Sequence, residues 1–346
     1  MKSSGLAQRL PRLWFRPRLS CWLIGFLPLS WLFGMLSSIR RLLYRSGVLR
    51  AGRLPVPVVV IGNLTVGGSG KTPLVLWLVE RLREQGWKPA IISRGYAGSA
   101  DGVRAVTADS QASEVGDEPL LLAQRSGVPV FVGRDRVAAG AALLAWHPPC
   151  NVIVSDDGLQ HYRLHRDAEI VVFDGRGEGN GHLLPAGPLR EPLARLSSVT
   201  AIVWNSAPGR SLPEATVPQA RMALVSDAFY ALNDSSTRCV AADLRGRQLF
   251  AMAGIGDPSR FFAQLQYLGL EFEARPFPDH QAYSEADLAF AKGGVLLMTE
   301  KDAVKCRHLP IYDAWVVPVA AEIEAVPGDP PLLNVILEKI NGCSPA

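Results

Sequence analysis

The chain has 346 residues, enough for two domains, and 48% of them are hydrophobic, which is ample for packed cores. The net charge of +4 is unevenly distributed, because residues 1–53 hold ten of the 36 Lys and Arg residues and no Asp or Glu. The remainder carries 26 basic and 32 acidic residues, which excludes a basic nucleic-acid-binding body and predicts that the basic arm contacts an anionic surface. The cysteines show no metal-binding spacing and are typical of reduced thiols in a cytosolic compartment. They are Cys21, Cys150, Cys239, Cys306 and Cys343.

Residues 19–36 form an 18-residue, mostly apolar stretch with cations on both sides. As a helix it would reach about 27 Å, just short of the hydrocarbon core of a bilayer. Gly25 and Pro28 weaken a straight helix, and Trp22 and Trp31 suit a membrane–water boundary. We expect a helix or hairpin that lies in the membrane interface; a spanning helix and an ordinary buried helix are the alternatives.

After residue 53, apolar runs alternate with helical stretches, which is typical of buried parallel strands and their crossover helices. In the first half, strands are expected at 56–61, 90–92, 128–132, 152–154, 170–173 and 201–204, with helices at 74–85 and 136–146. The alternation of strands and helices is lost over residues 206–247, where residues 222–225 could form a connecting strand. It resumes with strands at 249–253, 271–277, 295–299 and 315–319 and helices at 259–268 and 285–292, the latter beginning with a capping box at Ser284 and Asp287.

The fold class expected from this pattern is α/β: two three-layer α/β/α domains with mostly parallel sheets, preceded by a membrane-associating helix. The expected boundaries are an arm over 1–53, a first domain over 54–205, a linker region over 206–247 and a smaller second domain over 248–346. Gly254 and Gly256 follow a strand, but the third glycine of a dinucleotide-binding motif is missing, so a tight turn is the better interpretation.

The loop after the first strand has the composition of a phosphate-binding P-loop, so the first domain is expected to be P-loop NTPase-like. Its backbone N–H groups would wrap a polyphosphate, Lys71 would add a positive charge, and Thr72 would offer a hydroxyl to Mg²⁺. Thr65 stands where the usual pattern has its first glycine. ATP and Mg²⁺ are the expected cofactors. The residues expected to hold the nucleotide are Thr65, Val66, Gly67, Gly68, Ser69, Gly70, Lys71 and Thr72.

Carboxylates mark three further positions. Asp156 and Asp157 end an apolar strand, where a P-loop fold holds its metal, and they point to opposite faces, so which one binds Mg²⁺ stays open. Asp117 lies in an acidic loop and could orient an acceptor hydroxyl and accept its proton. His280 could pair with Asp117 as a dyad across a domain cleft; taken singly, they would be a solvated loop acid and a turn histidine.

Polar residues on other strand-end loops are candidates for binding an anionic substrate, with surface polar groups as the alternative. These candidates are Arg94, Tyr96, Gln160, His161 and Arg190. Residues 299–305 form a strand-to-helix turn of mixed charge, which we expect to be a solvated helix start.

The ordered combination of these motifs resembles the tetraacyldisaccharide 4'-kinase family, the lipid A 4'-kinases of Gram-negative bacteria, over nearly the whole chain. The segments that carry the resemblance are the basic, apolar N-terminus and residues 62–73, 93–96, 116–119, 155–161, 277–280 and 299–305. Thr65 at the first P-loop position also fits this family.

The resemblance implies transfer of the ATP γ-phosphoryl group to the 4'-hydroxyl of tetraacyldisaccharide 1-phosphate at the cytoplasmic face of the inner membrane. It implies that Asp117 is the catalytic base paired with His280, that Lys71 and Thr72 hold phosphate and Mg²⁺, and that the other candidates line the nucleotide or substrate site. The expected partners are a lipid substrate and a membrane surface, with no nucleic acid and no obligate protein partner. A membrane-associated P-loop ATPase switch is the main alternative, and a small-molecule kinase with an incidental anchor is a third.

Overall fold

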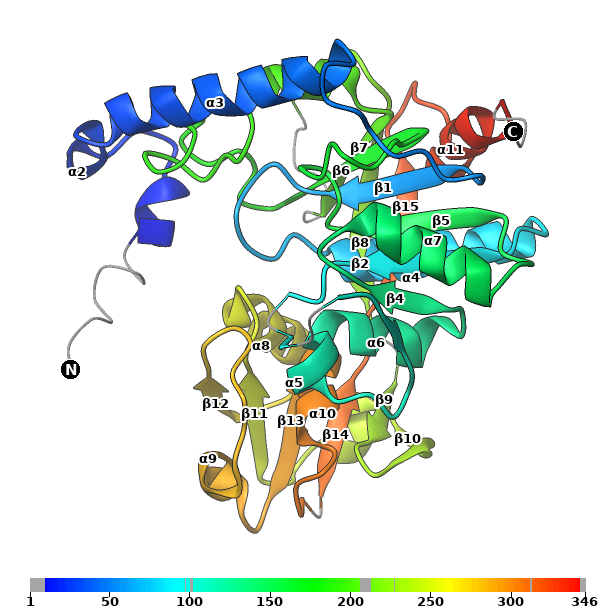
Figure 1. The fold of residues 1–346 in the computed structure, drawn as a ribbon. Coiled ribbons are helices and arrows are strands. Elements are labelled where there is room, and N and C mark those ends of the chain that lie inside the picture. The colour runs from blue at the N-terminus through cyan, green and yellow to red at the C-terminus, as the bar shows by residue number, and fades with distance from the viewer. Residues whose placement is uncertain are drawn as a thin grey trace.

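The computed structural model describes residues 10–96, 98–99, 102–205, 213–226, 228–311 and 313–342. It consists of two α/β bodies, with a helical arm lying along the first of them (Figure 1). Both sheets are mostly parallel, which confirms the fold class expected from the sequence.

The larger sheet has nine strands within the described residues. Their order is β15-β8-β7-β6-β1-β5-β2-β4-β3, and only the edge strands β15 and β3 pair antiparallel to their neighbours. The strands are β1 (Val58–Gly62), β2 (Pro89–Ser93), β3 (Arg104–Val106), β4 (Val130–Val132), β5 (Val152–Asp156), β6 (Ala168–Asp174), β7 (Ala201–Asn205), β8 (Gln219–Val225) and β15 (Ala320–Ala325). β1 is buried at every position, as its unbroken apolar run predicts.

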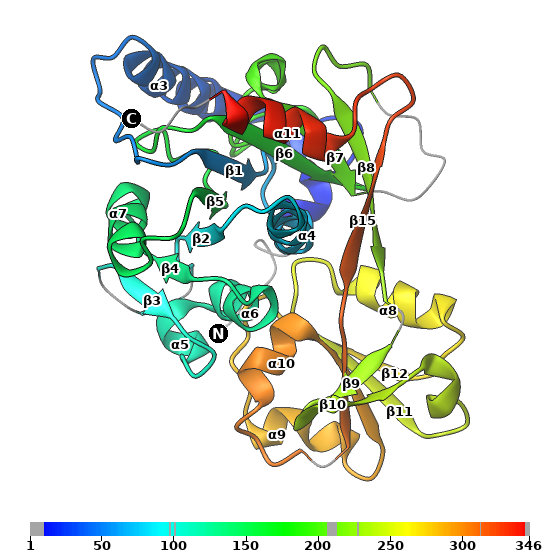
Figure 2. The ribbon, with the colours of Figure 1, turned by 90° about the vertical axis from the view of Figure 1, so that its right-hand side faces the viewer.

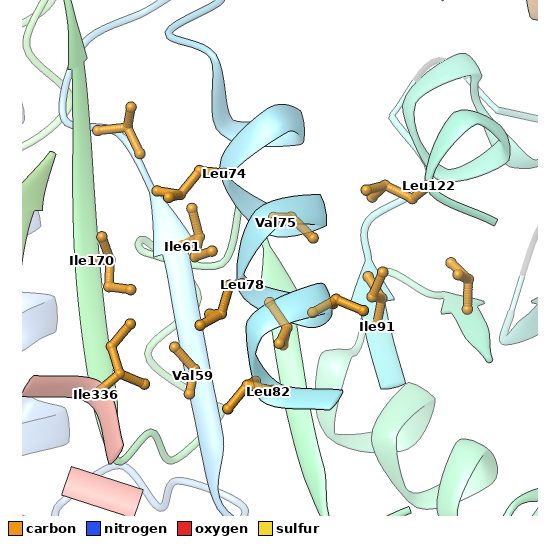
Figure 3. Close-up of a cluster of buried hydrophobic side chains, with 14 of the residues drawn as sticks. Val59, Ile61, Leu74, Val75, Leu78, Leu82, Ile91, Leu122, Ile170 and Ile336 are labelled. Carbon is orange, nitrogen blue, oxygen red and sulfur yellow. The ribbon is translucent and has the colours of Figure 1, made fainter. Parts of the chain in front are cut away.

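Helices cover both faces of this sheet (Figure 2). The helices of this body are α4 (Lys71–Glu84), α5 (Ala112–Val115), α6 (Asp117–Ser126), α7 (Arg136–Trp146), α11 (Leu332–Asn341) and the 3₁₀ helix η1 (Leu193–Ser198). α4, α6 and α11 contribute to the hydrophobic core on one face, and α7 packs on the other. Figure 3 shows Leu74, Leu78 and Leu82 of α4 packed towards Val59 and Ile61 of β1. This packing fixes the start of α4 beside the end of β1, where the candidate site lies.

The smaller sheet has six strands in the part of the chain that the structure describes. Its strands are β9 (Phe229–Ala231), β10 (Asp234–Cys239), β11 (Leu249–Ala253), β12 (Glu273–Pro276), β13 (Val295–Thr299) and β14 (Ala314–Val317), in the order β10-β9-β14-β13-β11-β12. The helices of this body are α8 (Pro258–Tyr267), α9 (Glu285–Leu288), α10 (Glu300–Cys306) and the 3₁₀ helices η2 (Ala241–Leu244) and η3 (Ala289–Ala291). Separate hydrophobic clusters fill its two faces, with Phe261 and Leu265 of α8 in one and Ala303 and Cys306 of α10 in the other. The expected capping box is present at Ser284 and Asp287.

The structure places the boundaries between the two bodies differently from those expected at residues 205 and 248. β8, from the expected linker, is a strand of the larger sheet, and β15 and α11, from the expected second domain, also belong to the first body. The chain therefore enters the second body after β8 and returns along β15, so that two paired strands lie at the junction (Figure 2). β15 alternates small or apolar residues with Glu322 and Glu324 and is exposed or partly exposed at every position, so its sequence does not show the continuous apolar run of the central strands.

The N-terminal arm contains α2 (Cys21–Ile24) and α3 (Leu27–Arg45), and the break between them falls at Gly25 and Phe26. Pro28 lies in the first turn of α3, where the missing N–H costs nothing. Ser30 and Gly34 are the buried residues of α3, and the Ser30 hydroxyl donates to the Leu183 carbonyl at 2.9 Å. Among the described residues, no helix has the length and apolar character needed to cross a bilayer.

Candidate functional site

The P-loop connects the end of β1 to the start of α4 and is held from behind by hydrogen bonds. The Asn63 side chain donates to the Gly67 carbonyl at 3.0 Å, and the Val66 N–H donates to the Pro188 carbonyl at 2.9 Å. Gly70 has φ 89°, and a Cβ there would lie 2.3 Å from the Asn205 amide nitrogen, so glycine is required. Thr65 and Ser69 are buried, whereas Gly67 and Gly68 are exposed. The loop thus offers its backbone at a helix N-terminus, which suits a polyphosphate.

Lys71 begins α4, and Thr72, the next residue, lines a cavity. The Lys71 ammonium lies 3.4 Å from Asp157 Oδ1, and the Arg190 guanidinium lies 3.6 Å from the same oxygen. Burial would raise the pKa of Asp157, but these two cations outweigh it and hold that pKa below its ordinary value. Asp157 has φ 47°, a left-handed conformation that turns it towards the cations. Arg190 also donates to Gln160 at 3.4 Å.

Asp156 ends β5 and is fully buried. Its Oδ2 accepts from the Ser93 hydroxyl at 3.1 Å, and its Oδ1 has no hydrogen-bond partner among the described residues. Burial, with the nearby charge of Glu118, raises the pKa of Asp156 to about 7. The two adjacent carboxylates therefore have different environments, as predicted from the alternation of side chains between the two faces of a strand.

No three His, Cys, Asp or Glu side chains of the described residues lie close enough to hold a metal ion by themselves. Mg²⁺ does not need such a cage, since it is held by one or two carboxylates together with water and substrate phosphates. The unpartnered oxygen of Asp156 and the hydroxyl of Thr72 at the cavity provide hard oxygen ligands of this kind. The residues present therefore fit Mg²⁺.

Asp117 and His280, 163 residues apart, lie side by side across the junction of the two bodies. Asp117 begins α6, and His280 follows β12 with φ 60°. His280 Nδ1 is 3.0 Å from both carboxylate oxygens of Asp117, and the Tyr96 ring lies 5.1 Å from the imidazole. Burial would raise the pKa of Asp117, but the His280 hydrogen bond and the nearby lysines outweigh it and lower that pKa. The hydrogen bond to Asp117 raises the pKa of His280. The expected pairing is thus present as a contact.

The segment expected to be a solvated helix start is instead largely buried, and that expectation was wrong. Glu300, Asp302 and Lys305 of α10 are all buried. Asp302 accepts hydrogen bonds from the Gly254 N–H, the Thr299 hydroxyl and the Tyr283 hydroxyl, so the helix start is held to the turn that follows β11. The charges at 299–305 are therefore an internal network, which the sequence did not distinguish from surface charge.

Two lysines of α10 approach Asp117, and the sequence did not single them out. Lys301 Nζ lies 3.9 Å from Asp117 Oδ2 and 3.0 Å from Glu118 Oε1, while Lys305 Nζ lies 3.9 Å from Asp117 Oδ2. Their spacing of four residues places both on one face of the helix, which is the one signal that could have identified them.

The remaining candidates are spread more widely. Arg94 and Tyr96 are exposed, and Gln160 donates to the Asn63 carbonyl at 3.1 Å behind the P-loop. His161 is half-buried near Arg136 and Arg166, and burial together with these cations lowers its pKa to about 4. The structure therefore brings Gln160 and Arg190 to the P-loop and Tyr96 to His280. Within the described ranges, Arg94 and His161 form no side-chain hydrogen bond or ion pair with the P-loop or with the Asp117–His280 pair.

A cavity of about 420 Å³ lies between the P-loop and the second body. Gly68, Gly70 and Thr72 border it on one side, and Ile255, Phe261 and Lys301 border it on the other. Arg260 of α8 donates to Asn205 at 2.8 Å, and Asn205 donates to the Ser69 carbonyl at 3.0 Å, so the second body is connected to the P-loop. Gly254 and Gly256 allow close packing here, because added Cβ atoms would lie 2.2 Å from the Tyr283 hydroxyl and 3.1 Å from Gly68 N.

Comparison with known proteins places this geometry in a family. The family model described as tetraacyldisaccharide-1-P 4'-kinase matches residues 22–341. The chain is 54% identical over 341 residues to the tetraacyldisaccharide 4'-kinase of Dechloromonas aromatica, covering 97% of this chain and 98% of the relative. It is 56% identical over 296 residues to the enzyme of that name from Azoarcus sp., covering 86% and 87%.

A solved structure supports the same assignment. The crystal structure of the "apo" form of LpxK from Aquifex aeolicus in complex with ATP matches with a TM-score of 0.79 and 31% sequence identity. The match covers 92% of this chain and 99% of that one. The family model, which matches residues 22–341, extends over α2 and α3 of the arm, the P-loop body and the second body. The chain therefore belongs to the tetraacyldisaccharide 4'-kinase family.

Proposed function

We propose that the junction between the two bodies transfers the γ-phosphoryl group of ATP to the 4'-hydroxyl of tetraacyldisaccharide 1-phosphate at a membrane surface. Membership of the family makes the chain an ATP-dependent kinase of this class. The observation that carries the assignment of the site is the contact between Asp117 and His280 beside the P-loop cavity. Glu118 and Asp279, the sequence neighbours of the two residues, line that cavity.

In this proposal Asp117 is the catalytic base. The acceptor oxygen forms a bond to the γ-phosphorus, the bond from that phosphorus to the bridging oxygen of ADP breaks, and Asp117 takes the hydroxyl proton late in the step. Its lowered pKa keeps the carboxylate ionised at neutral pH, as a base must be. His280 orients the carboxylate, and Tyr96 lies beside the imidazole, where an acceptor sugar would approach.

The P-loop and the cavity form the proposed nucleotide site. The backbone of residues 67–70 and the ammonium of Lys71 would hold the β- and γ-phosphates at the N-terminus of α4. Apolar side chains such as Leu76, Leu224 and Phe261 line the cavity and suit the nucleoside. Because these side chains come from both bodies, a bound nucleotide would contact both.

Asp156 and Thr72 would hold Mg²⁺, which neutralises charge on the transferring phosphate when it is bound. Asp157 has a different proposed role, because it pairs with Lys71 and Arg190 and so orients two cations at the P-loop. Arg94, Arg190, Gln160 and His161 stay candidates for binding the anionic headgroup, with Arg190 and Gln160 nearest the P-loop.

We propose that the arm lies on the cytoplasmic face of the inner membrane. Along α2 and α3 the exposed side chains include several large apolar ones: Trp22, Ile24, Leu29, Trp31, Leu32, Met35, Leu36, Ile39 and Leu42. Arg40, Arg41 and Arg45 lie in the second half of α3. Exposed apolar side chains with adjacent cations favour an anionic lipid surface, which would bring the catalyst to a lipid acceptor.

The direct test is an assay with radiolabelled γ-phosphate ATP and the disaccharide lipid dispersed in detergent. The proposal predicts that label moves to the lipid and that ADP forms in equal amount. Release of labelled inorganic phosphate without labelled lipid would instead identify a P-loop ATPase switch. Transfer to a soluble sugar in preference to the lipid would identify a small-molecule kinase.

A further inference from the structure

One side chain of the second body connects the two halves of the candidate dyad. Lys301 Nζ lies 3.0 Å from Glu118 Oε1 and 3.1 Å from Asp279 Oδ1. Glu118 is next to Asp117 at the start of α6, and Asp279 precedes His280. The Lys301 side chain is only 14% exposed, so these contacts form in an environment that water screens weakly.

We propose that Lys301 is a positioning residue, whose ammonium clamps the loop carrying His280 against the start of α6 and thereby sets the contact between His280 and Asp117. This inference rests on the proposed roles of Asp117 and His280. Lys301 acts through those residues and is distinct from the phosphate-binding Lys71.

The backbone of the His280 loop supports the clamp. His280 has φ 60°, a conformation that a non-glycine residue keeps only when its surroundings fix it. Asp279 Oδ1 accepts a hydrogen bond from the His280 N–H at 3.1 Å and also accepts from Lys301 Nζ at 3.1 Å. Lys301 therefore holds the carboxylate that fixes the backbone of His280.

The charges at the junction between the two bodies also support the proposed role of Lys301. Three carboxylates meet there, from Asp117, Glu118 and Asp279, and without a cation between them they would repel one another. Lys305 is the other lysine that approaches Asp117, but its ammonium lies closer to Asp302, at 3.0 Å. The Tyr283 ring lies 4.8 Å from the Lys305 ammonium and supplies no charge. Both lysines thus lie between acids of the two bodies, but Lys301 is close to both, at 3.0 Å from Glu118 and 3.1 Å from Asp279.

The test compares Lys301→Met with Lys301→Arg, with the double variant Lys301→Met/Asp279→Asn, and with Lys292→Met as an exposed control on the second body. In the lipid kinase assay, Lys301→Met should lower kcat about tenfold to a hundredfold through misplacement of the dyad, with KM for ATP unchanged. Lys301→Arg should keep most of kcat. The double variant should recover part of the loss, because it removes one of the facing acids. Lys292→Met should match the wild type.

The pH profile gives a second kinetic readout. His280, Lys301 and Lys305 lower the pKa of Asp117, against the effect of burial. Removal of Lys301, together with a weaker contact to His280, should raise the pKa of Asp117. The acid limb of the kcat profile should therefore move to higher pH in Lys301→Met. An acid limb identical to that of the wild type would count against the clamp.

A measurement without substrate separates this inference from the proposed function. The hydrogen bond to Asp117 is the main cause of the raised pKa of His280. The Lys301 charge itself lowers the His280 pKa, so its removal with the contact intact would raise that pKa, whereas loss of the contact would lower it. Asp279, whose Oδ2 lies 3.7 Å from His280 Nε2, raises the same pKa. Proton NMR titration of the ligand-free protein, with His280→Gln used for assignment, should show a lower His280 pKa in Lys301→Met than in Lys301→Arg or Lys292→Met, because the clamp predicts that the lost contact outweighs the lost charge. Such a result supports the clamp even if the wild type fails to phosphorylate the lipid.

Three results would overturn the inference. An unchanged or raised His280 pKa in Lys301→Met would show that the contact does not depend on Lys301, because loss of the lysine charge alone raises that pKa. A raised KM for ATP with unchanged kcat would make Lys301 a nucleotide contact. A lower melting temperature with wild-type kcat and KM would leave it a stabilising residue only.

Discussion

At the scale of single residues, the site places similar chemical groups in different environments. Asp117 and Asp156 are buried and the Asp157 side chain is 33% exposed. His280, Lys71 and Arg190 lower the pKa of Asp117 and Asp157, while burial raises that of Asp156 to about 7. Such divergence assigns different roles to like side chains. Asp117 suits a base, Asp156 a ligand for a cation, and Asp157 a partner of Lys71.

Substitution of Asp117 by Asn should separate catalysis from nucleotide binding. Asn keeps the shape but accepts no proton, so kcat should fall about a hundredfold to ten-thousandfold. The affinity for ATP, measured by calorimetry, should stay close to that of the wild type. Asp109→Asn, at an exposed position, is the matched control. A parallel loss of ATP affinity in Asp117→Asn would make Asp117 a nucleotide or metal residue.

His161 should make the stability of the protein depend on pH. Its pKa is lowered to about 4, so the unfolded chain binds a proton that the folded chain does not between about pH 6.5 and 4. Its contribution to the unfolding free energy therefore falls as pH decreases through that range. The unfolding free energies of His161→Gln and the wild type should be compared by denaturant unfolding at pH 7 and pH 5. On going from pH 7 to pH 5, the unfolding free energy of the variant should rise relative to that of the wild type by on the order of 1 kcal/mol. An equal difference at both pH values would show that His161 does not titrate in this way.

At the scale of elements, the helices that carry the site were predictable from local patterns. α7 begins where Asp135 caps Val137 and Ala138, and α4 begins where the glycines of the P-loop end. The apolar face of α4 follows the helical period, with Leu74, Leu78 and Leu82 all buried. Local signals therefore positioned the P-loop correctly, because the loop, its strand and its helix are contiguous in sequence.

Truncation of a core residue of α4 tests this packing. Leu78 is fully buried against β1 (Figure 3), so Leu78→Ala should lower the unfolding free energy by about 2–5 kcal/mol. Leu42→Ala, at a 64% exposed position on α3, should change it by less than about 0.5 kcal/mol. Equal effects in urea unfolding would contradict the packing of α4 on the sheet.

The arm offers a test at the same scale. Trp31→Ser combined with Met35→Ser removes two large apolar side chains from the exposed surface of α3. This variant should sediment less with vesicles containing anionic lipid, because it buries less apolar area in the interface. Tyr267→Ser, at a 92% exposed position on α8, should bind vesicles like the wild type. Unchanged sedimentation of the α3 variant would place the membrane contact elsewhere.

At the scale of the whole molecule, the sequence predicted two α/β bodies but not how the chain divides between them. β15 completes the larger sheet only by pairing with β8, far earlier in the chain, and its half-exposed pattern resembles that of a loop or edge strand. The contact between Asp117 and His280 was anticipated from the family resemblance, since no local signal joins residues 163 positions apart. The clamp by Lys301 could not be predicted, because charge alone does not show burial.

The proposed reaction of this two-body junction is phosphorylation of the 4'-hydroxyl of an acylated disaccharide. The most direct measurement is phosphorus–proton correlation NMR of the lipid product formed from ATP by the wild type, by Lys71→Ala and by the exposed control Lys88→Ala. A new phosphorus coupled to the proton at position 4' is expected with the wild type and Lys88→Ala, and none with Lys71→Ala, which lacks the P-loop charge. A phosphate on another hydroxyl, or normal product from Lys71→Ala, would rule out phosphorylation of the 4'-hydroxyl at this junction.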